Sequence, residues 1–497
     1  MKNIIIIGGG IAGLSAGCYL QKHGFKTQIF EQHSLPGGLC TSWQRKGYTF
    51  DACIHWLVGT NKTDSFYKYW NEIIKMEDIY FYEDEEFFRL FDKDNNQLIV
   101  YRNIDRFEKT LLSIATDKGD MKLISEFAAA TRKLLNFNLP SDKAPELISF
   151  MDSLKMFIKI FPFMGTFNKW NKISAGDFAS KFKNPLIKKL FQTLFMPEFP
   201  VFFILFMFVW FTKKNAGYPI GGSLNFAKLL EKNFVANKGI ITYNSKVEKI
   251  ITENGNAKGV ITNKGETHYT DIVISASDGF NTIFNMLEGK YVNKKIENIY
   301  KNYKVFPSFL QVSFGIDAKL NNMPGTCGYI LEKDLTIDDK TTTDTIGFRI
   351  FNFDPTLAPD GKTSVIATLN TYNYEYWVKL KIENPDKYKA EKQRIADELA
   401  EIFITKTGIS KEQIEVTDVS TPSTVIRYTG NWKGSFEGWI ITPGMGFKSL
   451  SKILPGLNNF YLIGQWVEPG GGLPACILSA RNLTQIICKK ANISFNP

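Results

Sequence analysis

Histidine and cysteine are scarce in this chain of 497 residues, which contains four histidines and six cysteines. No two cysteines form a CxxC pair, so the sequence indicates neither a zinc site nor a disulfide framework, and we predict no metal site. This cysteine usage fits a reducing cytoplasm. The first apolar strand is expected at 4–7, which leaves no room for a signal peptide, so we predict a cytoplasmic protein.

Long hydrophobic runs and dense basic segments are also missing. The most apolar stretch, 201–211, falls well short of the roughly 20 residues that a bilayer span needs. The net charge of +10 is spread over the chain without a nucleic-acid motif, so no nucleic-acid partner is predicted. The excess of positive charge instead favours contact with an anionic membrane surface.

The clearest pattern lies at the start of the chain, where Ile4–Ile7 predicts a buried parallel strand. Gly8 permits a tight turn, Gly10 lets a diphosphate approach the backbone, and Gly13 lets the next helix pack against the strand. Glu31 ends a second predicted strand, at the distance where an acid binds the hydroxyls of a ribose. Together these residues predict a Rossmann-like dinucleotide-binding unit.

A second glycine pair, Gly37 and Gly38, follows this acid. A flavin nucleotide needs backbone room at this point for its ribityl chain and diphosphate, whereas a nicotinamide nucleotide does not. No second GxGxxG motif follows a strand, so a separate nicotinamide domain is not indicated. The sequence therefore predicts FAD as the cofactor.

At these residues the chain resembles a known family. Residues 8–42 are similar to the flavoproteins that include amine oxidases, phytoene desaturases, carotenoid isomerases and retinol saturases. Residues 48–56 resemble the segment of that family that passes beside the isoalloxazine ring. Segments 354–362 and 460–476 are most similar to the phytoene desaturase and retinol saturase branch.

The resemblance implies further positions of the cofactor site. Val247 would contact adenine through its backbone. The second flavin motif, near the C-terminus, contains Gly464, Gly471, Gly472 and Leu473. Backbone N–H groups at the start of the helix that follows would stabilise negative charge on the reduced flavin.

We expect an α/β fold in which two domains are interleaved. A Rossmann-like FAD-binding domain of the glutathione reductase type is predicted to be discontinuous, with segments 1–62, 215–290 and 430–497. An α+β substrate-binding domain built on a mixed sheet is predicted for 63–214 and 291–429.

Two apolar segments of the substrate-binding domain are candidates for membrane contact. Residues Met151 to Phe161 place apolar side chains at helical spacing, which suits a helix in a membrane interface or one packed on the core with solvated lysines. The stretch 201–211 is flanked by lysines, which suits a segment that dips into one membrane face. It also suits the wall of a buried lipid tunnel.

Few side chains are expected to take part in chemistry, because a flavin itself moves the hydride. His55 is a candidate proton donor, since it is the only histidine inside a flavin motif; a buried histidine bound to backbone is the alternative. Tyr428 and Glu468 are further candidates, although Glu468 could equally pair with Arg481. Covalent attachment of the flavin stays open for three thiols, those of Cys40, Cys53 and Cys476.

We predict an FAD-dependent oxidoreductase that transfers hydride between flavin N5 and a C–C or C=C bond of a long, apolar, unsaturated lipid of carotenoid or retinoid type. The 41 phenylalanines fit an aromatic-lined cavity for such a substrate. Three alternatives are a reduced-flavin-dependent cis–trans isomerase of a polyene, an amine oxidase, and a prenyl-lipid carrier without redox activity. Peripheral membrane contact is expected, while the electron donor or acceptor is not identified.

Overall fold

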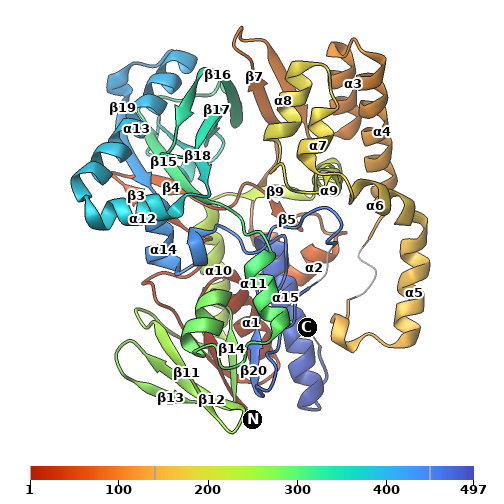
Figure 1. Ribbon diagram of the computed structural model, residues 1–497, viewed down its shortest axis with the longest axis vertical. Helices are drawn as coiled ribbons and strands as arrows, with labels where there is room; N and C mark the ends of the chain where they lie inside the picture. Colours follow the sequence, from red (N-terminus) through yellow and green to blue (C-terminus); the bar gives the residue numbers. More distant parts are fainter. Residues whose placement is uncertain (1, 139–141, 447–448, 497) are drawn as a thin grey trace.

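The computed structural model describes residues 2–138, 142–446 and 449–496 (Figure 1), and β1 (Asn3–Ile7) is the middle strand of one of its sheets. This strand lies in a parallel sheet with the strand order β10-β2-β1-β14-β20. Ile4 and Ile6 pack in one apolar cluster and Ile5 and Ile7 in another, so both faces of the strand are buried as predicted. The other strands are β2 (Lys26–Phe30), β10 (Ile240–Thr242), β14 (Ile272–Ser275) and β20 (Phe460–Leu462).

Helices cover one face of this sheet, and a small antiparallel sheet covers the other. On the helical face α1 (Ile11–Lys22) contacts both α10 (Gly222–Ala236) and α15 (Gly472–Lys490). The opposite face carries β11 (Val247–Glu253), β12 (Asn256–Thr262) and β13 (Thr267–Tyr269). This arrangement confirms the predicted Rossmann-like α/β fold.

A seven-stranded mixed sheet forms the other half of the molecule, with the order β19-β15-β18-β17-β16-β7-β8. β7 pairs with β16 in parallel, whereas the other neighbours in this sheet pair antiparallel. Its strands are β7 (Glu86–Phe91), β8 (Gln97–Tyr101), β15 (Ser308–Ile316), β16 (Thr326–Thr336), β17 (Thr342–Ile350), β18 (Thr363–Thr371) and β19 (Ile414–Ser420). Three helices accompany it, α12 (Tyr374–Glu383), α13 (Pro385–Thr407) and α14 (Pro422–Thr429).

The two sheets draw on alternating parts of the chain. Every strand of the mixed sheet lies within 63–214 or 291–429, and every strand of the parallel sheet lies within the three segments predicted for the FAD-binding domain. Short elements connect the halves, namely β3 (Ser42–Arg45), β4 (Tyr48–Asp51), β5 (Leu57–Val58), α2 (Ser65–Asn71), β6 (Phe81–Tyr82), β9 (Ala216–Pro219) and α11 (Lys294–Asn302). The exact domain boundaries stay a prediction.

A helical layer lies beside the mixed sheet and contains the most apolar helix, α9 (Val201–Thr212). Eight residues of α9 are buried, and the helix packs against α3, α4, α6 and α7. The hypothesis that 201–211 dips into a membrane is therefore wrong, because its side chains form a protein core. The half-buried Phe203, Phe206 and Trp210 leave the tunnel-wall hypothesis open as a prediction. The layer also contains α3 (Ile104–Ile114), α4 (Lys118–Leu134), α6 (Met164–Trp170), α7 (Ala175–Ser180) and α8 (Pro185–Thr193).

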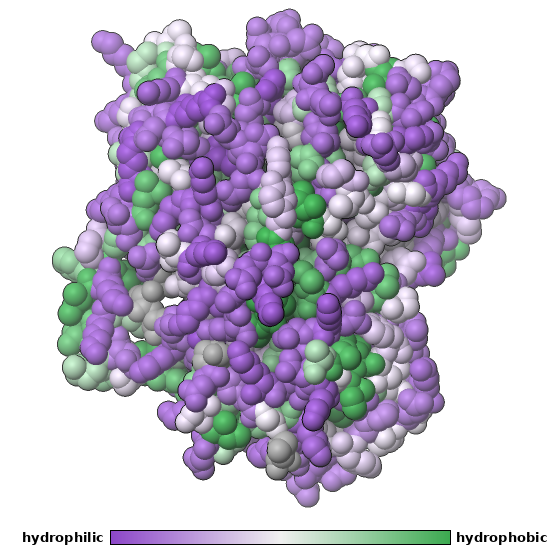
Figure 2. Space-filling model, turned by 180° about the vertical axis from the view of Figure 1, so that it is seen from behind, coloured by the Kyte–Doolittle hydropathy of each residue, from purple (hydrophilic) through white to green (hydrophobic). Residues whose placement is uncertain are grey.

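Helix α5 (Phe150–Ile160) differs from all of these because none of its residues is buried. It stands at the edge of the molecule in Figure 1, and apolar residues gather at the corresponding left edge of Figure 2. A capping box between Ser149 and Asp152 fixes its start, so the helix is well formed without core packing. No helix in the described part of the chain combines the length and the apolar character needed to cross a membrane. The exposed large apolar side chains here are Phe150, Met151, Leu154, Phe157, Ile158 and Phe161.

Candidate flavin site

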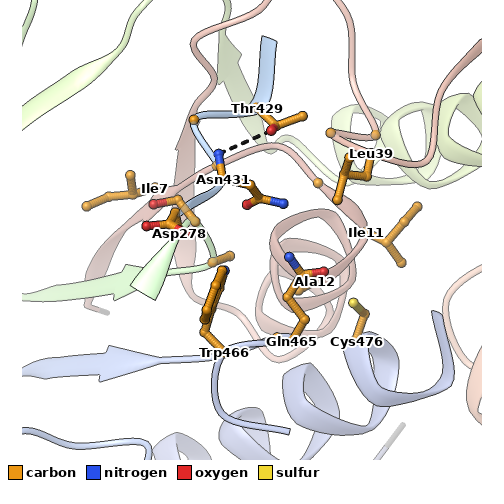
Figure 3. Close-up of a pocket in the computed structure, with 18 of the residues that line it drawn as sticks. Ile7, Ile11, Ala12, Leu39, Asp278, Thr429, Asn431, Gln465, Trp466 and Cys476 are labelled. Carbon is orange, nitrogen blue, oxygen red and sulfur yellow. Dashed lines mark hydrogen bonds between the residues drawn. The ribbon is translucent and has the colours of Figure 1, made fainter. Parts of the chain in front are cut away.

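A cavity opens at the carboxyl ends of β1, β2 and β14, where ligands of open α/β sheets bind. Figure 3 shows Ile11 and Ala12 of α1, Cys476 of α15 and Asp278 of the loop after β14 around the same space. Most of the predicted cofactor residues line it, namely Gly8, Gly10, Glu31, Gly37, Gly38, Val247, Gly464, Gly472 and Leu473. Gly13 and Gly471 lie directly behind this lining.

The first glycine turn has the geometry that its sequence predicts. Gly8 has a φ of +98°, which favours glycine. A Cβ on Gly13 would lie 2.0 Å from the carbonyl oxygen of Gly8, so α1 approaches β1 too closely for any side chain there. A Cβ on Gly10 would meet its nearest atom, the Gly37 oxygen, only at 3.8 Å. Gly10 therefore faces open cavity, where a diphosphate could reach the backbone.

Glu31 lies beside this turn and holds it in place. Its two carboxyl oxygens accept hydrogen bonds from the backbone N–H of Gly9 at 2.7 Å and of His33 at 2.8 Å. Desolvation by burial raises the pKa of Glu31 from its ordinary value, and these hydrogen bonds partly offset that rise. A carboxylate has about four lone-pair positions, so Glu31 can still accept the hydroxyls of a ribose.

The second glycine pair packs directly on the first turn. Gly37 donates its N–H to the Gly9 carbonyl at 2.9 Å, and a Cβ on Gly37 would lie 2.2 Å from the Cys40 oxygen. A Cβ on Gly38 would lie 3.4 Å from the Cα of Gly10. This wall of the cavity is thus made of backbone, which suits a flexible polyol and diphosphate.

The start of α15 closes the other end of the cavity. Gly470, Gly471 and Gly472 all have positive φ, between +58° and +93°, so the chain turns sharply into the helix. Gly471 is the N-cap, and no side chain of the described residues caps it. The first N–H groups of this long helix are therefore left for a ligand, and its dipole favours negative charge there.

Tyr428 lies at the ribose end of the cavity. Its ring meets the His33 ring edge-on at 4.8 Å, and its carbonyl accepts a hydrogen bond from Gln32 Nε2 at 2.7 Å. Both neighbours directly follow Glu31. The structure thus places Tyr428 beside the two residues that follow Glu31, and its catalytic role stays a prediction.

Glu468 is buried but does not line the cavity. Ser449 Oγ donates to its Oε2 at 2.5 Å, and the buried Lys452 Nζ lies 3.5 Å from its Oε1. Arg481 instead pairs with Glu72 at 2.7 Å. The predicted alternative of a Glu468–Arg481 pair is therefore wrong, and Glu468 occupies a structural ion-pair network rather than a position beside the reacting groups.

His55 is exposed to solvent and does not line this cavity. Desolvation lowers the pKa of His55 to about 3, and the charge of Arg349 acts in the same direction. Arg349 also donates to the His55 carbonyl at 3.0 Å. Both effects favour the neutral imidazole of His55 over the imidazolium. Its catalytic role stays a prediction.

Sequence reasoning missed two acids that line the cavity, Asp278 and Glu437. The Asp278 carboxylate accepts backbone hydrogen bonds from Asn281 at 2.6 Å and Trp432 at 2.7 Å. Glu437 could have been noticed as a single acid within the apolar, glycine-containing stretch 434–439. Nothing local in the sequence indicates that Asp278 reaches the same cavity.

Three cysteines converge at the same place, as Cys40, Cys53 and Cys476 all line the cavity. Desolvation raises the pKa of Cys476 to about 12. The pKa of Cys40 is raised first by its hydrogen bond with Cys53 and then by burial. The Cys40 and Cys476 thiols therefore stay protonated at neutral pH, which disfavours the thiolate that covalent attachment needs.

Comparisons with known proteins agree with this geometry. Residues 6–73 match a family model described as an NAD(P)-binding Rossmann-like domain. The chain is 26% identical to 4,4'-diapophytoene desaturase (4,4'-diapolycopene-forming) from Methylomonas, over 99% of this chain and 96% of that protein. It is 25% identical to the chloroplastic prolycopene isomerase of Daucus carota, over 96% and 78% of the two chains.

Among solved structures, an oxidoreductase from Methanosarcina mazei covers 97% of this chain and is itself covered completely, with a TM-score of 0.58 and 16% identity. That likeness concerns the fold alone. The curated relatives confirm the resemblance given by the motifs at both ends of the sequence. The chain is a homologue, over almost its whole length, of carotenoid desaturases and isomerases of the FAD-dependent amine oxidase-like type.

Proposed function

We propose that this protein is an FAD-dependent oxidoreductase that transfers hydride between flavin N5 and a C–C or C=C bond of a long, apolar, unsaturated lipid. One observation carries the proposal: a single cavity joins a backbone-lined dinucleotide turn and Glu31 at one end to the uncapped start of α15 at the other. A polyene substrate is supported by relatives named as carotenoid desaturases.

The residues present fit FAD. The open backbone at Gly10 would take the diphosphate, Glu31 the ribose hydroxyls and the first turn of α15 the polar edge of the ring system. When bound, FAD supplies the hydride chemistry. The chain itself would contribute orientation, a largely backbone-lined cavity wall and acids that hold protons near the ring.

An aromatic series begins three residues after Cys53, which lines the cavity, and ends in the helical layer. The ring of Trp56, next to His55, meets the rings of Phe87 at 5.3 Å and Phe211 at 5.6 Å, and Phe211 belongs to α9. Apolar walls could hold a hydrocarbon chain without polar anchors, because burial of each CH₂ contributes about 0.8 kcal/mol. We propose this region, with the half-buried face of α9, as the binding surface of the lipid.

A second candidate function is the cis–trans isomerisation of a polyene with no net redox change. It is supported by an isomerase relative and by Glu437, a cavity acid that has no hydrogen bond or ion pair to its carboxyl group within the described residues. An isomerase that protonates its substrate needs a neutral acid. The direction of hydride transfer, saturation or desaturation, depends on the flavin potential and the electron partner.

The test is anaerobic. The FAD-loaded protein is reduced, and carotenoid-like and retinol-like polyenes are added in detergent. Flavin absorbance is followed while the mass of the lipid is determined by mass spectrometry. If the reduced flavin is reoxidised while the lipid gains two hydrogens, the protein is a saturase. If oxidised flavin instead becomes reduced when the lipid is added, the protein is a desaturase. Altered lipid geometry at constant mass and constant flavin state favours the isomerase. A protein that binds no flavin would refute the proposal in favour of a carrier.

We also propose that α5 docks on the membrane that supplies the lipid. Its exposed apolar residues include Phe150, which is 82% exposed, and Ile158, which is 63% exposed, and Lys155 and Lys159 flank them. An apolar face with adjacent lysines is typical of helices that lie in an anionic interface. Co-sedimentation with vesicles of anionic and zwitterionic lipid tests this, and binding to neither would refute it.

A further inference from the structure

Glu437 is fixed in position by backbone contacts on both sides. Phe436 donates its N–H to the Pro307 carbonyl at 3.2 Å, and Phe306 donates to the Gly438 carbonyl at 3.1 Å. A Cβ on Gly438 would lie 2.2 Å from the Gln465 oxygen, so this segment lies directly on the turn after β20. The Glu437 side chain thus projects into the cavity from a rigid backbone.

The carboxyl group lies over the glycine turn that begins α15. A Cβ on Gly471 would lie 2.7 Å from Glu437 Oε2, and one on Gly472 would lie 3.7 Å from Oε1. Within the described residues, no hydrogen bond or ion pair to this carboxyl group is found. Glu468 on the neighbouring loop is different, because Ser449 and Lys452 both contact its carboxylate.

The surroundings favour a neutral carboxyl group. Desolvation raises the pKa of Glu437 to about 8. Among the described residues, Cys476, one turn into α15, interacts with it, and burial raises the pKa of this thiol as well. Cys53 and Glu468 interact with Cys476 in turn. Among these groups none brings a positive charge that would hold Glu437 ionised.

The helix start can stabilise one negative charge, and two groups compete for it. An ionised Glu437 would occupy the field of the α15 N-terminus, where the reduced ring system would carry its charge. A neutral Glu437 leaves this field to the ring and can also donate a hydrogen bond to it. Negative charge on the ring therefore favours the protonated carboxyl group.

We propose that Glu437 is the group that holds a proton at the ring end of the flavin site, protonated whenever the flavin is reduced and free to ionise when the flavin is oxidised. This inference rests on the proposed flavin function. In reduction from the ionised state, Glu437 takes one proton from solvent while the flavin receives two electrons and one proton. In reoxidation Glu437 returns that proton to solvent, and no bond from Glu437 to carbon forms.

The experiment is a potentiometric titration of the FAD-loaded protein between pH 7 and pH 10, followed by flavin absorbance. Uptake of one proton with two electrons lowers the midpoint potential by about 30 mV per pH unit. Proton uptake by Glu437 adds a second proton above its pKa. We therefore expect a slope of about 30 mV per pH unit near pH 7 that steepens to about 60 mV per pH unit above about pH 8.

Variants identify the group responsible. E437Q should keep the shallow slope throughout, whereas E468Q, which changes a buried acid outside the cavity, should keep the break. A wild-type protein that binds flavin without a break overturns the inference and leaves the proposed function intact, and this result needs no variant to fold. A break that persists in E437Q also overturns it. Failure to bind FAD at all would refute the proposed function, and the inference with it.

Discussion

Two glycines of the first turn should respond to the same substitution in opposite ways. At Gly13 the added methyl group of alanine would lie 2.0 Å from the Gly8 oxygen, a backbone atom that cannot move aside. Separation of α1 from β1 would disturb the parallel sheet, so we expect G13A to lose at least the 1–3 kcal/mol that is typical of overpacking. Chemical denaturation followed by far-UV circular dichroism measures this loss of stability.

At Gly10 the same methyl group meets only cavity. Gly10 has φ −71° and ψ 178°, which alanine adopts readily, so G10A should be as stable as wild type. A diphosphate that accepts a backbone hydrogen bond here would lose its close approach. A hydrogen bond to a charged group is worth about 1.5–3 kcal/mol, so FAD should bind roughly ten-fold to a hundred-fold more weakly.

Fluorescence titration of the apoprotein with FAD measures this affinity, and the two variants serve as controls for each other. G10A with unchanged FAD affinity would refute the placement of the diphosphate at this turn. G13A with unchanged stability would refute the close packing of α1 on β1.

Three further predictions concern charge and the exposed helix. E72Q should lower the denaturation midpoint strongly, because loss of one partner of the buried Arg481 ion pair costs about 3–5 kcal/mol, whereas K249M in an exposed pair should change it little. Burial raises the pKa of Asp278 to about 7, so the folded state keeps this proton to a higher pH than the unfolded state does. The free energy of unfolding should therefore fall by about 4 kcal/mol, through this group, as the pH rises from about 4 to 7. D278N should flatten this part of the pH profile, and an unchanged profile would exclude Asp278 as the cause. Replacement of Phe150 and Phe157 by serine should remove about 2–3 kcal/mol of the free energy of burial in the membrane interface, so vesicle binding should weaken roughly 100-fold. The control variant I382S, at an equally exposed site on α12, should bind as wild type does.

The dinucleotide turn could be predicted from sequence because its interactions are local. Gly8, Gly10, Gly13 and Glu31 lie within one strand–helix–strand unit, and each has a steric or hydrogen-bonding role that its residue type alone indicates. The C-terminal glycine turn was identified through its resemblance to the second flavin motif of the family. The fold class followed from these two motifs and from the alternation of strands and helices.

The apolar segments show where such reasoning ends. α9 is apolar on all sides, so its sequence cannot tell a core helix from one in contact with lipid. The answer depends on α3, α4, α6 and α7, which pack around it through contacts distant in sequence. Arg481 is a similar case, since its partner Glu72 lies 409 residues away while Glu468 is close in sequence.

The role proposed for Glu437 depends, like the roles of the two glycine turns, on local geometry, here the geometry at the start of α15. A helix N-terminus favours a negative charge, and in this cavity both a side chain and a redox cofactor could supply it. The fold is shared by proteins of only 16% identity, so it does not decide the chemistry. A carboxyl group that takes up a proton when the flavin is reduced would leave that charge to the ring and couple the reduction to pH. The proton state of Glu437, rather than the fold, would then set the potential at which hydride moves to or from the lipid.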